Sequence, residues 1–195
     1  MGCWAAGGGT SRVAIAILTA DGGRGTIRSV LVGLLAGEQV AREDIGERGQ
    51  WLFSLLITDL CGRDDPFFRP RFLGDKYPTF DYIIEVVDRP WYFFFVQVKG
   101  TTMGYTAEEN RLRVQVTQDD IDRMVAYPAP TYVVGIDVNA IGVGFLLSVN
   151  EPRNNVASLT TRFRIDCGVL EQLRDEVIDF WSSRDMTLTG SRFRE

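Results

Sequence analysis

The chain of 195 residues contains no histidine. Histidine supplies most protein zinc sites and the general base of Ser–His catalysis, so its absence excludes both classes of chemistry. A metal ion in this protein must therefore bind to oxygen ligands, which are the ligands that Mg²⁺ and Mn²⁺ prefer. The sequence predicts that the cofactor, if there is one, is Mg²⁺ or Mn²⁺.

Cysteine is also scarce. The three cysteines, Cys3, Cys61 and Cys167, are odd in number, lie far apart and form no CxxC pair. This spacing predicts no disulfide framework and favours a reducing compartment, the cytoplasm.

Long hydrophobic runs and an excess of basic charge are missing as well. The two apolar runs near the start, residues 13–18 and 29–36, are too short to span a bilayer, and no basic segment precedes them. We therefore expect no membrane partner. The net charge of −5 gives no global signal for nucleic acid, although a local basic groove can coexist with an acidic total.

Composition divides the chain into three parts. Residues 1–40 are rich in Gly and Ala and are predicted to be an N-terminal extension, either flexible or a mispredicted start. Residues 41–183 carry the hydrophobic patterns of one globular domain, and residues 184–195 are predicted to be a loose C-terminal tail.

Periodicity within the domain predicts an alternation of helices and strands. A helix is expected over residues 43–61, ending at Gly62 as a C-cap, and Pro70 suggests an edge position for the first strand. The other predicted elements are strands over 67–73, 80–87, 91–98 and 112–116, a helix over 118–126, strands over 132–138 and 143–149, and a helix over 168–181. This order predicts an α/β sandwich around a mixed sheet.

Two neighbouring apolar strands carry polar groups that a buried strand normally lacks. Side chains alternate along a strand, so Gln97 and Lys99 share one face at the end of the 91–98 strand. Asp81 begins the preceding strand. If the two strands form an antiparallel hairpin, Asp81 approaches Gln97 and Lys99.

This combination suits the hydrolysis of a phosphodiester bond. Asp81 would be the main metal ligand, Gln97 would supply a neutral oxygen, and the Val98 carbonyl is a further candidate ligand. Lys99 would orient the attacking water or stabilise the developing negative charge.

Less specific interpretations of the same residues stay open. Lys99 could be a strand-end lysine that reaches water, and Asp81 could pair with Arg69 or Arg71. Glu85 could be a second ligand, although pairing with a base along the hairpin is the simpler expectation. Three further acids, Asp119, Asp120 and Asp122, fit the acidic first turn of a helix better than a metal cluster.

The ordered context resembles the PD-(D/E)XK, or restriction-endonuclease-like, superfamily, and within it the bacterial domain-of-unknown-function 4365 family. The segments that carry the resemblance are Ile45-Gly-Glu-Arg-Gly-Gln50, Pro78-Thr-Phe-Asp-Tyr82, Phe94-Phe-Val-Gln-Val-Lys-Gly-Thr101 and Tyr127-Pro-Ala-Pro-Thr-Tyr-Val-Val134. The resemblance implies a three-layer sandwich with a central mixed β-sheet flanked by helices, and Mg²⁺-dependent endonuclease activity on DNA.

The first helix is where the sequence departs from this pattern. The superfamily usually places a Glu there; Gln50 matches that residue by position on the helix, whereas Glu47 matches it by chemistry. Both are therefore candidate metal ligands. A catalytically inactive module that binds nucleic acid or a protein is the alternative function. A role in bacterial defence or DNA processing follows only by analogy, and a homodimer or an operon-encoded protein partner stays open.

Overall fold

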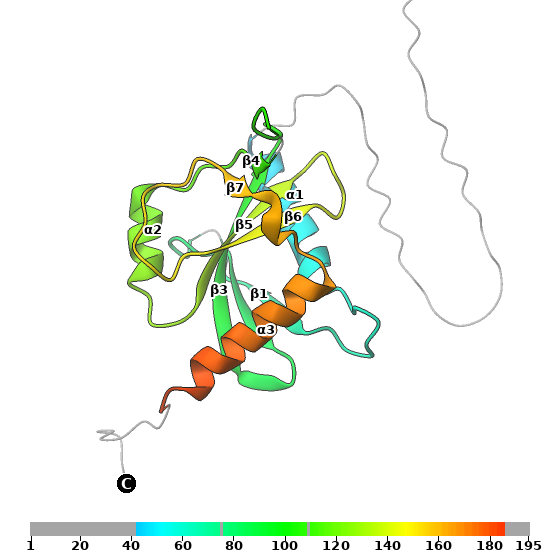
Figure 1. The fold of residues 1–195 in the computed structure, drawn as a ribbon, viewed down its shortest axis with the longest axis vertical. Helices are drawn as coiled ribbons and strands as arrows, with labels where there is room; N and C mark the ends of the chain where they lie inside the picture. Colours follow the sequence, from blue (N-terminus) through cyan, green and yellow to red (C-terminus); the bar gives the residue numbers. More distant parts are fainter. Residues whose placement is uncertain (1–41, 75, 109, 186–195) are drawn as a thin grey trace, which may run out of the picture. The chain divides into compact units, whose positions relative to one another are not determined.

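A five-stranded sheet with strand order β1-β2-β3-β5-β6 organises the computed structural model (Figure 1). The strands are β1 (Phe68–Phe72), β2 (Tyr82–Val86), β3 (Arg89–Thr101), β5 (Thr131–Asp137) and β6 (Gly144–Ser148). All neighbours are antiparallel except β3 and β5, which are parallel. The sheet is therefore mixed, as predicted, and Pro70 does lie on an edge strand, β1.

The structure describes residues 42–74, 76–108 and 110–185. The predicted extension over residues 1–40 lies outside these residues, and so does the predicted tail apart from residues 184 and 185. All described residues belong to one compact unit. None of the helices in this part of the chain is long and apolar enough to cross a membrane.

Helices cover both faces of the sheet. On one face α1 (Arg42–Ile57) passes over β3, and α3 (Cys167–Ser182) reaches β5, where Tyr132 donates to Glu176 over 2.7 Å. On the other face lie α2 (Gln118–Val125) and a small second sheet of β4 (Arg111–Leu112) and β7 (Leu159–Thr160). This arrangement confirms an α/β architecture with helices flanking a mixed sheet.

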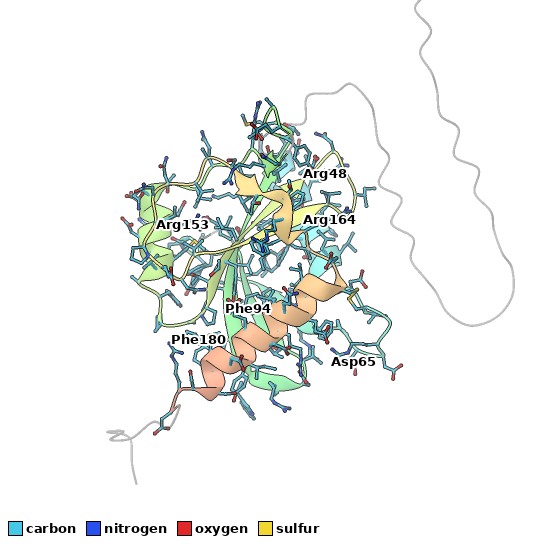
Figure 2. All side chains as sticks on the ribbon, viewed as in Figure 1. Arg48, Asp65, Phe94, Arg153, Arg164 and Phe180 are labelled. Carbon is cyan, nitrogen blue, oxygen red and sulfur yellow. A yellow bond between two sulfur atoms is a disulfide. The ribbon has the colours of Figure 1, made fainter. Side chains whose placement is uncertain are left out.

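The core occupies both faces of the sheet: one part lies under α2, β4 and β7, and the other lies between α1, α3 and the sheet. Phe94 is fully buried there, and its ring packs edge-on against Phe68 and Tyr132 at centroid distances of 5.3 and 5.4 Å (Figure 2). Burial of each such aromatic side chain contributes about 1.5–3 kcal/mol to folding. This packing fixes the position of β3, the strand that carries Gln97 and Lys99.

Two glycines bring α1 close to the end of β3. A Cβ on Gly100 would lie 2.5 Å from the Ile45 carbonyl oxygen, and one on Gly49 would lie 2.9 Å from the Gly100 Cα. Neither position can therefore hold a larger residue without moving α1 away. The glycine that follows Lys99 is thus explained by helix packing.

The end of α1 differs from the prediction. The helix ends at Ile57 instead of Cys61: the Asp59 N–H already makes a turn-type bond to the Leu56 carbonyl, and Cys61 and Gly62 then leave the helical region with positive φ angles of 52° and 74°. Cys61 is joined to Cys167, at the start of α3, by a disulfide. The expectation of no disulfide was therefore wrong: 106 residues separate the two cysteines in sequence, but the fold brings the two helix ends together.

The short elements also differ from the sequence prediction. β4 covers two residues instead of the five expected over 112–116, and its partner β7 was not predicted. The 3₁₀ helix η1 (Thr161–Phe163) was missed as well. Elements of two or three residues are too short to show a hydrophobic period. The five long strands and all three helices lie where periodicity placed them, within a few residues.

Candidate active site

Asp81 stands immediately before β2, where its carboxylate reaches the backbone of β3. One carboxylate oxygen accepts a hydrogen bond from the Val98 N–H over 2.6 Å, and the other accepts one from the Gln50 amide over 3.4 Å. The carboxylate therefore takes the place of a backbone acceptor at the point where β2 begins. Asp81 therefore reaches β3 at Val98, the residue between Gln97 and Lys99.

Burial raises the pKa of Asp81 above its ordinary value. The Val98 N–H, the charge of Lys99 and the Gln50 amide each lower this pKa, but desolvation is the largest influence. The negative charge of Asp120, in the first turn of α2, raises the pKa further. Asp81 is thus a carboxylate whose charge the protein does not fully compensate.

Gln97 lies in the same part of β3 and is only 5% exposed. Its amide oxygen is buried and has no hydrogen-bond partner among the residues that the structure describes. A buried polar atom without a partner costs about 1–3 kcal/mol, so such atoms usually have a ligand or a water. The Gln97 oxygen is therefore a vacant acceptor on the residue next to Val98, whose N–H donates to the Asp81 carboxylate.

Val98 contributes its backbone. The N–H and C=O of one strand residue point toward the same neighbouring strand. Because the Val98 N–H donates to Asp81, its carbonyl also faces the Asp81 side of β3. This orientation keeps the Val98 carbonyl oxygen among the candidate ligands.

Lys99 lies on the same face of β3 as Gln97 and is partly buried. Its charge acts on the Asp81 carboxylate, yet within the described ranges it forms no ion pair. The ammonium is consequently close to the site without being bound to one carboxylate. That position suits a cation that acts on a substrate or a water.

The structure distinguishes between the two candidates on α1. Gln50 contacts Asp81, whereas the Glu47 side chain is exposed and makes no hydrogen bond or ion pair with another described residue. Tyr82 and Ser54 support Gln50: the Tyr82 hydroxyl donates to the Gln50 carbonyl over 3.3 Å, and Ser54 donates to the same oxygen over 3.0 Å. Position on the helix, rather than charge, decides which residue meets Asp81.

The remaining acids have other partners. Glu85 forms a two-point ion pair with Arg71 of β1, at 2.9 and 3.1 Å, so the simpler expectation for Glu85 is confirmed and Arg71 is not a partner of Asp81. Asp119 and Asp120 form the acidic first turn of α2, as predicted, and Thr117, which was not predicted, is its N-cap. The electrostatic influence of Asp120 on Asp81 was not predicted from the sequence.

One further group of possible metal ligands joins Asp59, Cys61 and Cys167. The two sulfur atoms in this group are bonded to each other, and a single carboxylate then remains. This group does not provide the oxygen ligands that Mg²⁺ requires.

Comparison with family models, with curated proteins and with solved structures finds no match to this chain. The Asp81 carboxylate, the vacant Gln97 oxygen and the Val98 carbonyl are all oxygen donors, a set that suits Mg²⁺ or Mn²⁺.

Proposed function

We propose that this protein is a metal-dependent nuclease that hydrolyses DNA phosphodiester bonds, with a restriction-endonuclease-like fold of the PD-(D/E)XK type. The vacant, buried oxygen of Gln97, on the strand that Asp81 contacts, is the observation that carries the proposal. A fold retains such an atom at a cost in stability, and a bound cation would remove that cost.

Each residue of the site has a separate role in this proposal. Asp81 and Gln97 hold Mg²⁺ or Mn²⁺, with the Val98 carbonyl as a third oxygen, and Gln50 orients the Asp81 carboxylate from α1. A bound divalent ion polarises the phosphodiester and lowers the pKa of a coordinated water. Lys99 orients the attacking water and stabilises negative charge that develops on the phosphate oxygens.

The experiment is cleavage of plasmid and single-stranded DNA in Mg²⁺ or Mn²⁺ by the wild type, Lys99→Ala and Asp81→Ala. We expect cleavage by the wild type alone, with the circular dichroism of all three proteins unchanged. Equal cleavage by all three proteins would indicate a contaminating nuclease and refute the assignment of the site.

The second candidate function is a binding module that has the same fold but no activity. The contact between Gln50 and Asp81 favours it, because an uncharged residue occupies the place on α1 where a second carboxylate would strengthen metal binding. Salt-sensitive DNA binding without cleavage in either metal would select this function. A protein partner or a homodimer would then be the next possibility to test.

A further inference from the structure

An aromatic groove of about 550 Å³ lies between β3, the end of α3 and the segment that follows α2. Four aromatic residues line it, Phe93, Phe95, Tyr127 and Trp181, together with Pro128, Ala129, Arg184 and Asp185. The rings are held firmly: Phe95 packs on Tyr127 at 4.7 Å and Phe93 on Trp181 at 4.8 Å. The groove is therefore a pre-formed apolar surface in which Phe93 and Tyr127 are more exposed than Phe95 and Trp181, and Arg184 and Asp185 are its charged residues.

The groove borders the candidate active site. Phe93 and Phe95 precede Gln97 on one face of β3, and two strand residues span about 6.6 Å. Phe80, the residue before Asp81, packs edge-on against Tyr127 at 5.1 Å. The Tyr77 and Tyr127 hydroxyl groups are also hydrogen-bonded, at 2.7 Å. One wall of the groove thus continues directly into the Asp81 segment.

Three cations lie around the groove and the adjoining site, while one acid, Asp185, also lines the groove. Although the net charge of the chain is −5, Lys99 stands in the site, Arg184 lines the groove, and the exposed Lys76 precedes Tyr77. The Arg184 guanidinium lies over the Phe180 ring, 3.3 Å from its centroid, and is thereby fixed near the rim. Aromatic faces interleaved with cations are the usual surface on which single-stranded nucleic acids stack their bases.

We propose that this groove binds a base of a single-stranded nucleic acid whose backbone lies along the Asp81–Gln97–Lys99 site. This inference rests on the proposed nuclease function and adds the strandedness of its substrate. Bases inside a duplex are stacked and cannot enter such a groove without being extruded. Because the groove is mainly apolar, it recognises the face of a base more than its hydrogen-bonding edge, and binding tolerates different sequences.

The test measures binding in EDTA, where cleavage cannot interfere, by fluorescence anisotropy at one fixed salt concentration. The probes are a labelled thymidine oligonucleotide and the same oligonucleotide paired with its adenosine complement. We compare the wild type with Tyr127→Leu, Tyr127→Phe and Phe163→Leu. Phe163 is 41% exposed and lies on η1, outside the groove, so it provides a matched loss of an aromatic ring.

We expect the wild type to bind the single strand more tightly than the duplex. Tyr127→Leu weakens single-strand binding about 5- to 150-fold, the range for loss of one stacking partner, while Tyr127→Phe and Phe163→Leu do not. Unaltered thermal melting of the variants excludes a folding defect. Unchanged binding by Tyr127→Leu, or no preference for the single strand, would overturn the proposal and leave the groove to another occupant.

The two proposals fail in different ways. If the wild type does not cleave DNA but its single-strand binding depends on the Tyr127 ring, the nuclease function is wrong and the base-binding groove stands. If the wild type cleaves and Tyr127→Leu binds and cleaves single strands normally, the groove is wrong and the nuclease stands.

Discussion

Two acids lie four residues apart, Asp81 immediately before β2 and Glu85 within it. Glu85 meets Arg71 in a two-point ion pair near the surface. Among the described residues, Asp81 accepts hydrogen bonds from a backbone N–H and a neutral amide, and its burial raises its pKa. Glu85 is neutralised by the protein itself, whereas Asp81 keeps a charge that a bound cation could compensate.

The difference shows why chemistry alone does not identify a site. Both residues are acids on the same short stretch, and Glu85 has the longer reach. What separates them is the neighbouring strand: β1 supplies a guanidinium to Glu85, while β3 presents the Val98 N–H to Asp81 and the buried Gln97 amide beside it. Removing the charge of Asp81 should therefore reduce cleavage and stabilise the metal-free protein. Removing the charge of Glu85 should leave cleavage unchanged and destabilise the protein.

The largest effect is expected for a matched pair of amide substitutions, Asp81→Asn and Glu85→Gln. Asp81→Asn removes the carboxylate that accepts the Val98 N–H beside Gln97 and Lys99, so Mg²⁺-dependent DNA cleavage should fall at least about 100-fold. Glu85→Gln should keep cleavage close to the wild-type level. The initial rate of plasmid nicking measures both, and a comparable loss in the two variants would remove the distinction between the acids.

Gly100→Ala should have the next largest effect, this time on stability. The added Cβ would meet the Ile45 carbonyl at 2.5 Å, so α1 must move off β3, at a cost of about 1–3 kcal/mol. Because α1 carries Gln50, this movement also disturbs Asp81 but not Glu85. Urea unfolding measures the loss of stability.

Gly46→Ala is the control for that substitution. Gly46 lies in α1, the helix that packs against Gly100, and nothing stands within 4 Å of a Cβ placed at Gly46. Alanine at this position should stabilise the protein by about 0.5–1 kcal/mol, since glycine is unfavourable within a helix. A loss of stability in Gly46→Ala equal to that in Gly100→Ala would mean that the close approach of α1 to β3 is not the cause.

A smaller effect is expected on the pH dependence of stability without metal. Because the folded state raises the pKa of Asp81, ionised Asp81 destabilises the metal-free fold at neutral pH, and this penalty disappears as the pH falls below the ordinary aspartate pKa. Asp81→Asn should therefore melt higher than the wild type at neutral pH in EDTA, and no higher in acid. Glu85→Gln should melt lower at neutral pH, because it breaks an ion pair.

The smallest effect is expected for Arg71→Gln. The Arg71 side chain is 56% exposed, and exposed ion pairs contribute little to stability. Its loss should shift thermal melting only slightly and leave cleavage unchanged. A large loss of cleavage in Arg71→Gln would show that the Glu85 pair supports the site after all.

The sequence predicted the frame of this site well, because the long strands and helices have strong hydrophobic periods. The hairpin of β2 and β3 followed from two apolar runs and the tight connection between them, and it placed Asp81 beside β3. The choice between Glu47 and Gln50 could not be made from the sequence. It depends on the rotation of α1, which the close contact of Gly49 with Gly100 sets.

Features that depend on residues distant in sequence could not be predicted at all. The disulfide between Cys61 and Cys167 requires the end of α1 to meet the start of α3, and no local pattern encodes that contact. The electrostatic influence of Asp120 on Asp81 likewise depends on the packing of α2 against the sheet. The aromatic groove combines residues from three separate segments and has no signature in any one of them.

Direct binding of Mn²⁺ is the measurement that tests the site most directly. Isothermal titration of the wild type, Asp81→Asn and Glu85→Gln at neutral pH would compare the two acids with no substrate present. We predict one Mn²⁺ site in the wild type and in Glu85→Gln, and its loss in Asp81→Asn. Equal Mn²⁺ binding by all three proteins, or loss of binding in Glu85→Gln alone, would contradict the assignment of Asp81 as the metal-binding carboxylate.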